Sequence, residues 1–118
     1  ANTPLTSTSW DGDARSTTAK TLIDLSAVFG VPAGVKAVDV KVMLRDSGSA
    51  SYGALVVLSP YNTSYSGKSW QCGGLPNDYT HRASGIVPCN ADGDIYYQVD
   101  ASGVNTLDVW LEIWGYYL

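Results

Sequence analysis

The sequence predicts an all-β protein, an antiparallel β-sandwich of the jelly-roll kind. Three observations predict it: apolar residues alternate with polar ones in several segments, turn-forming residues separate these segments, and no window has the periodicity of a long amphipathic helix. The 118 residues match the length of one domain and can bury a hydrophobic core. We therefore expect a single β-sandwich domain over residues 1–118, in which residues 1–9 are a linker or a first extended strand.

Two segments alternate over a long stretch, and each predicts a half-buried strand. In residues 38–45 the apolar side chains fall on one face and the charged ones on the other. The pattern recurs from Leu107 to Trp114, where the aliphatic residues face inward. Trp110, Glu112 and Trp114 are therefore expected to face outward.

Shorter segments complete the predicted sandwich. Strands of the same kind are expected at residues 21–25 and 95–99. The continuously apolar run 54–58 predicts a strand that is covered on both faces. Residues 26–29 can form one helical turn. Residues 61–88 are rich in Gly, Ser, Asn and Tyr, and are expected to form long loops with short strands among them.

Composition and charge exclude several classes of protein. Seven Lys and Arg stand against eleven Asp and Glu, a formal net charge of −4, so we expect no binding to nucleic acid through phosphate neutralisation. No stretch approaches about 18 uninterrupted apolar residues, so we expect no membrane insertion. The aromatic and β-branched content excludes intrinsic disorder. The chain begins at Ala1 without Met, and we expect it to be the mature or excised end of a longer protein.

The two cysteines leave two interpretations open. Cys72 and Cys89 either form a disulfide or remain two buried thiols. They are too few to form a zinc site, even with the single histidine, His81. We therefore expect no metal site and no cofactor.

Two pairs of aspartates flank a glycine, Asp11/Asp13 and Asp92/Asp94. Such loops can hold calcium, but neither continues into the pattern of a calcium-binding loop, and Asp-Gly is common turn chemistry. Catalysis has little support, because no motif fixes the distance between His81 and a nucleophile. We expect a protein without enzymatic activity. A small polysaccharide hydrolase that uses Asp92 or Asp94 with His81 is the last alternative.

The aromatic residues of the last strand are the most informative feature of the sequence. Two outward indoles on one strand, Trp110 and Trp114, form a patch that is too apolar to lie in water without a reason. They pack against loops of the same chain, form a subunit interface or stack against sugar rings. We assign Trp110, Glu112, Trp114 and Tyr116 to an oligomer interface.

A second aromatic group lies in the loop-rich middle of the sequence, among Ser, Asn and Gly residues. Its members are Tyr52, Tyr61, Tyr65, Trp70 and Tyr79. This composition is typical of adaptable recognition loops and favours a binding surface over an active site. The candidate ligand-binding residues are Tyr61, Tyr65, Trp70, Tyr79 and His81.

Two segments resemble the C-terminal domains of bacteriophage tail proteins. The first comprises Thr21-Leu22-Ile23-Asp24-Leu25, Gly30-Val31-Pro32-Ala33-Gly34, the strand from Val35 to Arg45 and Asp46-Ser47-Gly48-Ser49-Ala50. The second is the ending Val109-Trp110-Leu111-Glu112-Ile113-Trp114-Gly115-Tyr116-Tyr117-Leu118, which is similar to the terminal strand that closes many such chains. The likeness includes no catalytic or metal-binding motif, and it does not extend to residues 61–88.

The resemblance implies the β-sandwich tip of a tail fibre, tailspike or tail needle, located in the virion. Such a tip is usually a homotrimer that contacts the host surface. We therefore expect a trimer that binds a host cell-surface receptor such as a polysaccharide. The main alternative is a carbohydrate-binding module in which Tyr61, Tyr65, Trp70 or Trp110 stacks on sugar.

Overall fold

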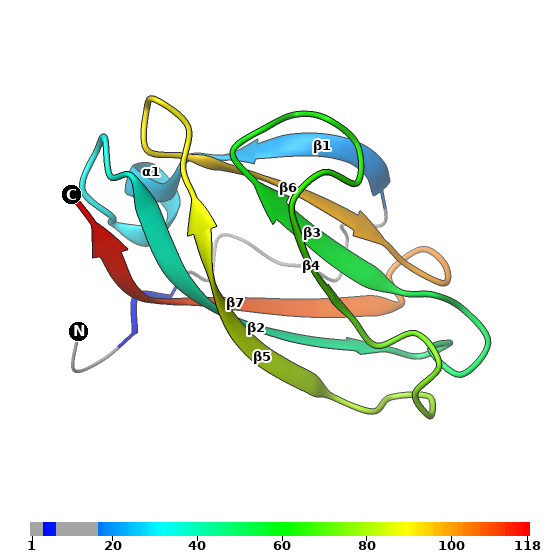
Figure 1. Cartoon of the computed structure of the whole chain (residues 1–118). Coiled ribbons are helices and arrows are strands. Elements are labelled where there is room, and N and C mark those ends of the chain that lie inside the picture. Colours follow the sequence, from blue (N-terminus) through cyan, green and yellow to red (C-terminus); the bar gives the residue numbers. More distant parts are fainter. Residues whose placement is uncertain (1–3, 7–16) are drawn as a thin grey trace.

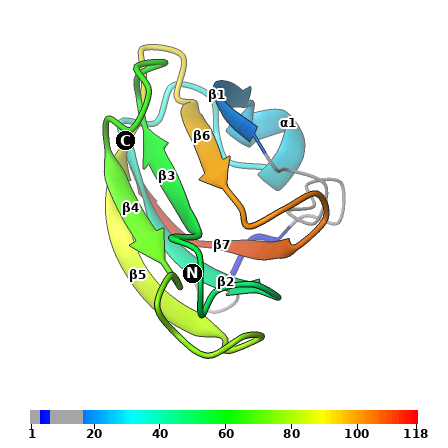
Figure 2. The same cartoon turned by 90° about the vertical axis from the view of Figure 1, so that its right-hand side faces the viewer.

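The computed structural model of the chain describes residues 4–6 and 17–118. Within these residues the elements are β1 (Thr17–Ile23), α1 (Leu25–Phe29), β2 (Ala37–Asp46), β3 (Leu55–Ser59), β4 (Lys68–Gln71), β5 (His81–Pro88), β6 (Ile95–Asp100) and β7 (Leu107–Tyr117). The strands form two antiparallel sheets, β1-β6-β3-β4 and β5-β2-β7, which lie as two layers in Figures 1 and 2. The predicted all-β sandwich is confirmed.

The antiparallel strand pairs are nested along the sequence. β3 pairs with β4, β2 with β5, and β1 with β6. Outside them, Leu5 bridges to Ile113 of β7 through one backbone hydrogen bond of 2.9 Å in each direction. In chain order, each of these pairs lies within the next one outward. The pairings β3·β6 and β2·β7 join them into the two sheets. This is the wrapping of a jelly roll, in which the Leu5 bridge takes the place of the first strand.

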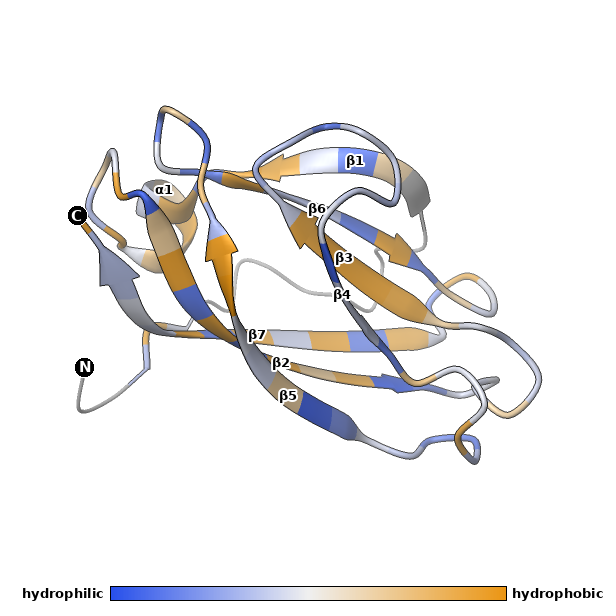
Figure 3. Cartoon of the chain, in the orientation of Figure 1, coloured by the Kyte–Doolittle hydropathy of each residue, from blue (hydrophilic) through white to orange (hydrophobic). Residues whose placement is uncertain are grey.

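Alternation along the strands builds the core between the two sheets. β2 buries every second residue, and β7 does the same from Leu107 to Ile113, as predicted (Figure 3). β3 is almost wholly buried, also as predicted. Its core-facing residues Val56 and Leu58 lie between the sheets, while Val57 is buried on the outer side of its sheet.

The predicted helical turn is confirmed as α1, and it shortens the strand that was expected at residues 21–25. β1 ends at Ile23, and Asp24 caps the helix by accepting the backbone N–H of Ala27 at 3.1 Å. This hydrogen bond is the main reason that the pKa of Asp24 lies below its ordinary value. At the other end, Gly30 has a φ of 75°, a left-handed conformation that suits glycine.

The largest departure from the predicted elements lies in residues 61–88. β5 is an eight-residue strand, and it pairs with β2 along its whole length. Its inward side includes Ala83 and Gly85, opposite Val42 and Val40. Because small residues of this kind give little apolar alternation, the sequence pattern does not reveal the strand.

The two cysteines are separate thiols, so the disulfide interpretation is excluded. Cys72 lies at the end of the sandwich where Gly74 donates to the carbonyl of Ser49, just beyond β2. Cys89 donates its N–H to the carbonyl of Lys36, just before β2. A disulfide needs Cα atoms within about 7 Å, whereas a ten-residue strand such as β2 spans about 33 Å. Burial raises the pKa of Cys89 to about 11, so this group is a neutral thiol at pH 7.

Candidate functional site

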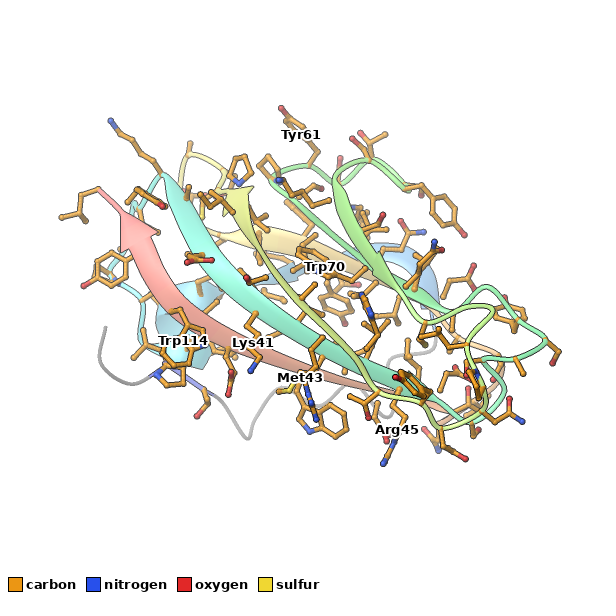
Figure 4. All side chains as sticks on the ribbon, turned by 60° about the horizontal axis from the view of Figure 1, so that its bottom comes forward. Lys41, Met43, Arg45, Tyr61, Trp70 and Trp114 are labelled. Carbon is orange, nitrogen blue, oxygen red and sulfur yellow. The ribbon has the colours of Figure 1, made fainter. Side chains whose placement is uncertain are left out.

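The outer face of the sheet β5-β2-β7 carries an exposed aromatic stripe on β7. Trp110 is 44% exposed and Trp114 is 38% exposed, with Glu112 between them on the same face, as predicted. On β2, Met43 lies opposite Trp110 and Lys41 lies opposite Glu112. Figure 4 shows Lys41 and Met43 in a row along β2, with Trp114 beside them. We call these five residues the tryptophan face.

The carboxylate at the centre of the tryptophan face has partners within the face. Glu112 Oε1 accepts a hydrogen bond from Trp114 Nε1 at 3.2 Å and lies 3.8 Å from Lys41 Nζ. Such a surface ion pair contributes at most about 1 kcal/mol to the free energy of unfolding. The effect of these contacts is local: Lys41 and Trp114 both contact Glu112, and the hydrogen bond from Trp114 orients its indole.

The next row of side chains is paired in the same way. Arg45 forms an ion pair with Asp108 across the two strands, with Nε 3.1 Å from Oδ2. The guanidinium carbon of Arg45 also lies 5.8 Å from the centre of the Trp110 ring, within the range of a cation–π contact. Because the charges on the tryptophan face and in this neighbouring row are paired, another surface can bury the face without leaving an isolated charge.

The stripe ends at a β-bulge. The register of β2 and β7 shifts between Asp39 and Val40, where Trp114 is the extra residue. Beyond the bulge, the expected interface residue Tyr116 lies opposite Val38, whose side chain is in the core. The exposed Tyr116 therefore projects from the other face of the sheet and does not share the face of Trp110 and Trp114. A cleft of about 250 Å³ opens here and is lined by Leu5, Ile113, Trp114, Gly115 and Tyr116.

The outer face of the other sheet is covered by a loop of the same chain. Residues 60–67 connect β3 to β4 (Figure 1). Beneath them, the fully buried side chain of Gln98 on β6 accepts the N–H of Tyr65 at 2.7 Å. From β1, Lys20 Nζ donates to the carbonyl of Ser66 at 2.9 Å, and burial lowers the pKa of Lys20. Side chains of two strands thus anchor the loop.

Side chains from three separate segments meet beside this loop. The hydroxyl of Tyr52 donates to Asp100 Oδ1 at 2.7 Å, and the hydroxyl of Tyr65 donates to Oδ2 of the same carboxylate at 3.2 Å. Tyr52 is 40% exposed and Tyr65 is 54% exposed. The hydrogen bond to Asp100 raises the pKa of Tyr52, and the negative charge of Asp100 raises the pKa of Tyr65. We call Tyr52, Tyr65 and Asp100 the tyrosine site.

Tyr65 has a left-handed backbone conformation. Its φ is 59°, which costs a non-glycine residue on the order of 1–3 kcal/mol. A glycine would present the same N–H to Gln98 without that cost. What this position gains from tyrosine is therefore the side chain that reaches Asp100.

A buried carboxylate ties together the loops at the end of the sandwich that holds Tyr52. Asp46 is fully buried and accepts the N–H of Gly48 at 2.7 Å and that of Ser102 at 3.1 Å. Burial acts to raise the pKa of Asp46, but the hydrogen bonds outweigh burial and the pKa lies below its ordinary value. Asp46 thereby fixes the segment that leads to Tyr52 against the loop that follows Asp100.

The predicted ligand-binding residues do not form one site. Tyr61 and Tyr65 are exposed on the same loop, 60–67. Tyr79 is exposed in the turn before β5, where it donates its N–H to the carbonyl of Pro76. His81 begins β5, opposite the buried Leu44 of β2, and is partly buried.

The structure corrects the assignment of Trp70 to ligand binding. Its side chain is only 6% exposed and belongs to the core. Gly85 of β5 lies against the indole, since a Cβ at that position would come within 3.3 Å of Trp70 Cζ2. The indole therefore fills the space between β4 and β5, and it offers no face to a ligand.

The residues of the hydrolase alternative, His81 with Asp92 or Asp94, lie at the two ends of β5. His81 begins β5, and the two aspartates follow its end at Pro88, a distance of about 26 Å for eight residues. Asp94 instead accepts the N–H of Leu25 at 3.0 Å, and burial raises the pKa of its carboxyl.

The described residues form neither a metal-binding cluster nor a membrane-spanning helix. No group of three or more His, Cys, Asp and Glu side chains is placed there to hold a metal ion. The aspartates Asp11 and Asp13 lie outside the described part of the chain. In that part, no helix has the length and apolar character needed to cross a bilayer.

Sequence patterns do not select two of the three residues of the tyrosine site. Tyr52 belongs to the aromatic group of the middle segment, but nothing distinguishes it from its neighbours there. Asp100 follows the predicted strand 95–99, and its only signal is its place at a strand end before a turn.

Comparisons with known proteins identify no family for this chain. No protein-family model matches its sequence, and no curated protein is significantly similar to it.

Proposed function

We propose that this chain is a tip module of a bacteriophage tail protein, without enzymatic activity, that forms a homotrimer in the virion and binds a glycan receptor on the host surface. The observation that carries the proposal is the tryptophan face, which exposes two indoles on a regular strand and pairs the charges around them. Tryptophan is enriched in the buried centres of subunit interfaces, where charged residues are depleted. The resemblance of the last ten residues to the closing strand of phage tail domains supports the same proposal.

A threefold assembly requires two complementary patches on each protomer, because its interfaces are heterologous. The exposed indole of Trp110 is one such patch. The cleft beside Trp114 and Tyr116 is a hollow with aromatic walls and is the other. In the proposed trimer, the Trp110 indole of one protomer packs against the cleft of the next protomer.

Light scattering at micromolar concentration tests the assembly. We expect a mass of three protomers of 12.5 kDa for the wild-type chain. Trp110→Arg should yield folded monomers, because it places a charge beside Arg45 in the contact. Leu22→Arg is the matched control, since Leu22 is an exposed apolar residue on the opposite sheet, and it should leave the trimer intact. A wild-type monomer whose indoles are accessible to a soluble quencher would contradict the proposal.

A carbohydrate-binding module that acts as a monomer is the second candidate. It is favoured by the exposed Tyr61 and Tyr65 on an anchored loop, whereas Trp70 no longer contributes to it. Sugar binding by a monomeric wild-type chain, unchanged in Trp110→Arg, would favour this candidate over the trimeric tip.

A further inference from the structure

We propose that the tyrosine site is the receptor-binding site of this module and that it takes a neutral saccharide. This inference rests on the proposed function and assigns residues and a ligand class to its receptor-binding half. The site consists of Tyr52, Tyr65 and Asp100, on the side of the sandwich opposite the tryptophan face.

The site presents hydrogen-bond acceptors. A carboxylate offers about four lone-pair positions, and the two phenols use one on each oxygen of Asp100. Each phenol has its proton directed to Asp100, so its own oxygen is left as an acceptor. A cluster of acceptors is complementary to a ligand that carries several hydroxyl donors on adjacent carbons, as a saccharide does.

The tyrosine rings supply the apolar part of the site. Tyr52 and Tyr65 are each substantially exposed, and Tyr61 is exposed on the same loop as Tyr65. A flat aromatic ring can cover the C–H face of a sugar ring while polar atoms beside it bind the hydroxyls. The exposed rings therefore match the C–H face of a pyranose, and the shared acceptors match its hydroxyl groups.

The site is held in place before a ligand arrives. The buried Gln98 fixes the backbone of Tyr65, and Lys20 fixes the neighbouring Ser66. Asp46 fixes the loops that lead to Tyr52 and away from Asp100. An ordered site loses less conformational entropy on binding, which favours affinity.

The charge of the site selects the class of saccharide. Asp100 is an acid, and the whole chain carries a formal net charge of −4. The ammonium of Lys20 is occupied beneath the loop by Ser59 Oγ and the carbonyl of Ser66. A uronic or sialic acid would therefore face repulsion at the carboxylate, whereas a neutral sugar would not.

A glycan array tests the proposal with the full chain. The probes are oligosaccharides of glucose, galactose, mannose and N-acetylglucosamine, and matched oligosaccharides that contain glucuronic or sialic acid. We expect binding to neutral probes only. Asp100→Asn and Tyr65→Phe should weaken it at least about tenfold, because each removes hydrogen bonds made to a charged or shared group.

The controls separate this inference from the proposed function. Tyr117→Phe makes the same chemical change at an exposed tyrosine of the other sheet and should bind as the wild type does. Saccharide binding that persists in Asp100→Asn and Tyr65→Phe would overturn the site while leaving receptor binding intact. Preference for acidic probes would overturn the ligand class, and binding to none of the probes would overturn the inference as a whole. The trimer, measured on the same sample by light scattering, is decided independently of these outcomes.

Discussion

The two outer faces of the sandwich are built in different ways. The tryptophan face consists of side chains that two paired strands project outward, such as the exposed Trp110 and its half-buried cross-strand neighbour Met43. The opposite sheet instead buries its outward residues Val57 and Gln98, and Gln98 binds the loop 60–67. The comparison shows that strand periodicity alone forms the tryptophan face. The outer face of the opposite sheet depends instead on the path of the loop 60–67 across it.

This difference assigns separate tasks to the two faces in the proposed assembly. A regular sheet face repeats the same row spacing along the strands and suits packing against a flat neighbouring surface. A loop-covered face brings together residues from distant segments, which suits recognition of a small polar ligand. Because the faces lie on opposite sides of the sandwich, a receptor bound to one face would not compete with a protomer packed on the other in the proposed assembly.

The largest expected effect on stability comes from the hydrophobic core, which lies between the two sheets. Trp70→Ala should lower the free energy of unfolding by about 3–5 kcal/mol, because it removes a buried indole and leaves a cavity beside Gly85. Urea unfolding followed by circular dichroism measures this. Trp114→Ala is the control and should change the free energy of unfolding of the protomer far less, since that indole is exposed. Equal losses in the two variants would contradict the different placement of the two tryptophans.

A smaller loss of stability should affect the face that the loop 60–67 covers and not the tryptophan face. Gln98→Leu keeps the volume but leaves the N–H of Tyr65 without its acceptor, which should cost about 1–3 kcal/mol and expose residues 60–67 to proteolysis. Limited proteolysis with mass spectrometry and urea unfolding measure the two changes. Tyr65→Gly keeps the N–H donor and relieves the strained φ, so it should leave the loop protected. Assembly through the tryptophan face should be unaffected in both variants.

The smallest effect concerns the ionisation of the phenols at the tyrosine site. Asp100 raises the pKa of Tyr52 and of Tyr65, so both stay protonated to a higher pH than an ordinary tyrosine. Any stability from this contact is present below the ordinary tyrosine pKa and is lost as the pH rises through the raised values. Asp100→Asn should lower both pKa values, which an alkaline titration by ultraviolet absorbance measures. A titration curve identical to that of the wild type would show that the two phenols do not share this carboxylate.

The sequence by itself determined the sandwich, the strands around residues 38–45 and 107–113, the helical turn and the outward direction of Trp110 and Trp114. These features follow from the period of two along a strand and from local turn chemistry, and both are written in neighbouring residues. The tertiary structure alone decided that Trp70 lies in the core and that Cys72 and Cys89 lie at opposite ends. It alone joined Tyr52, Tyr65 and Asp100, because contacts between distant segments depend on strand register and loop path, which no local pattern specifies.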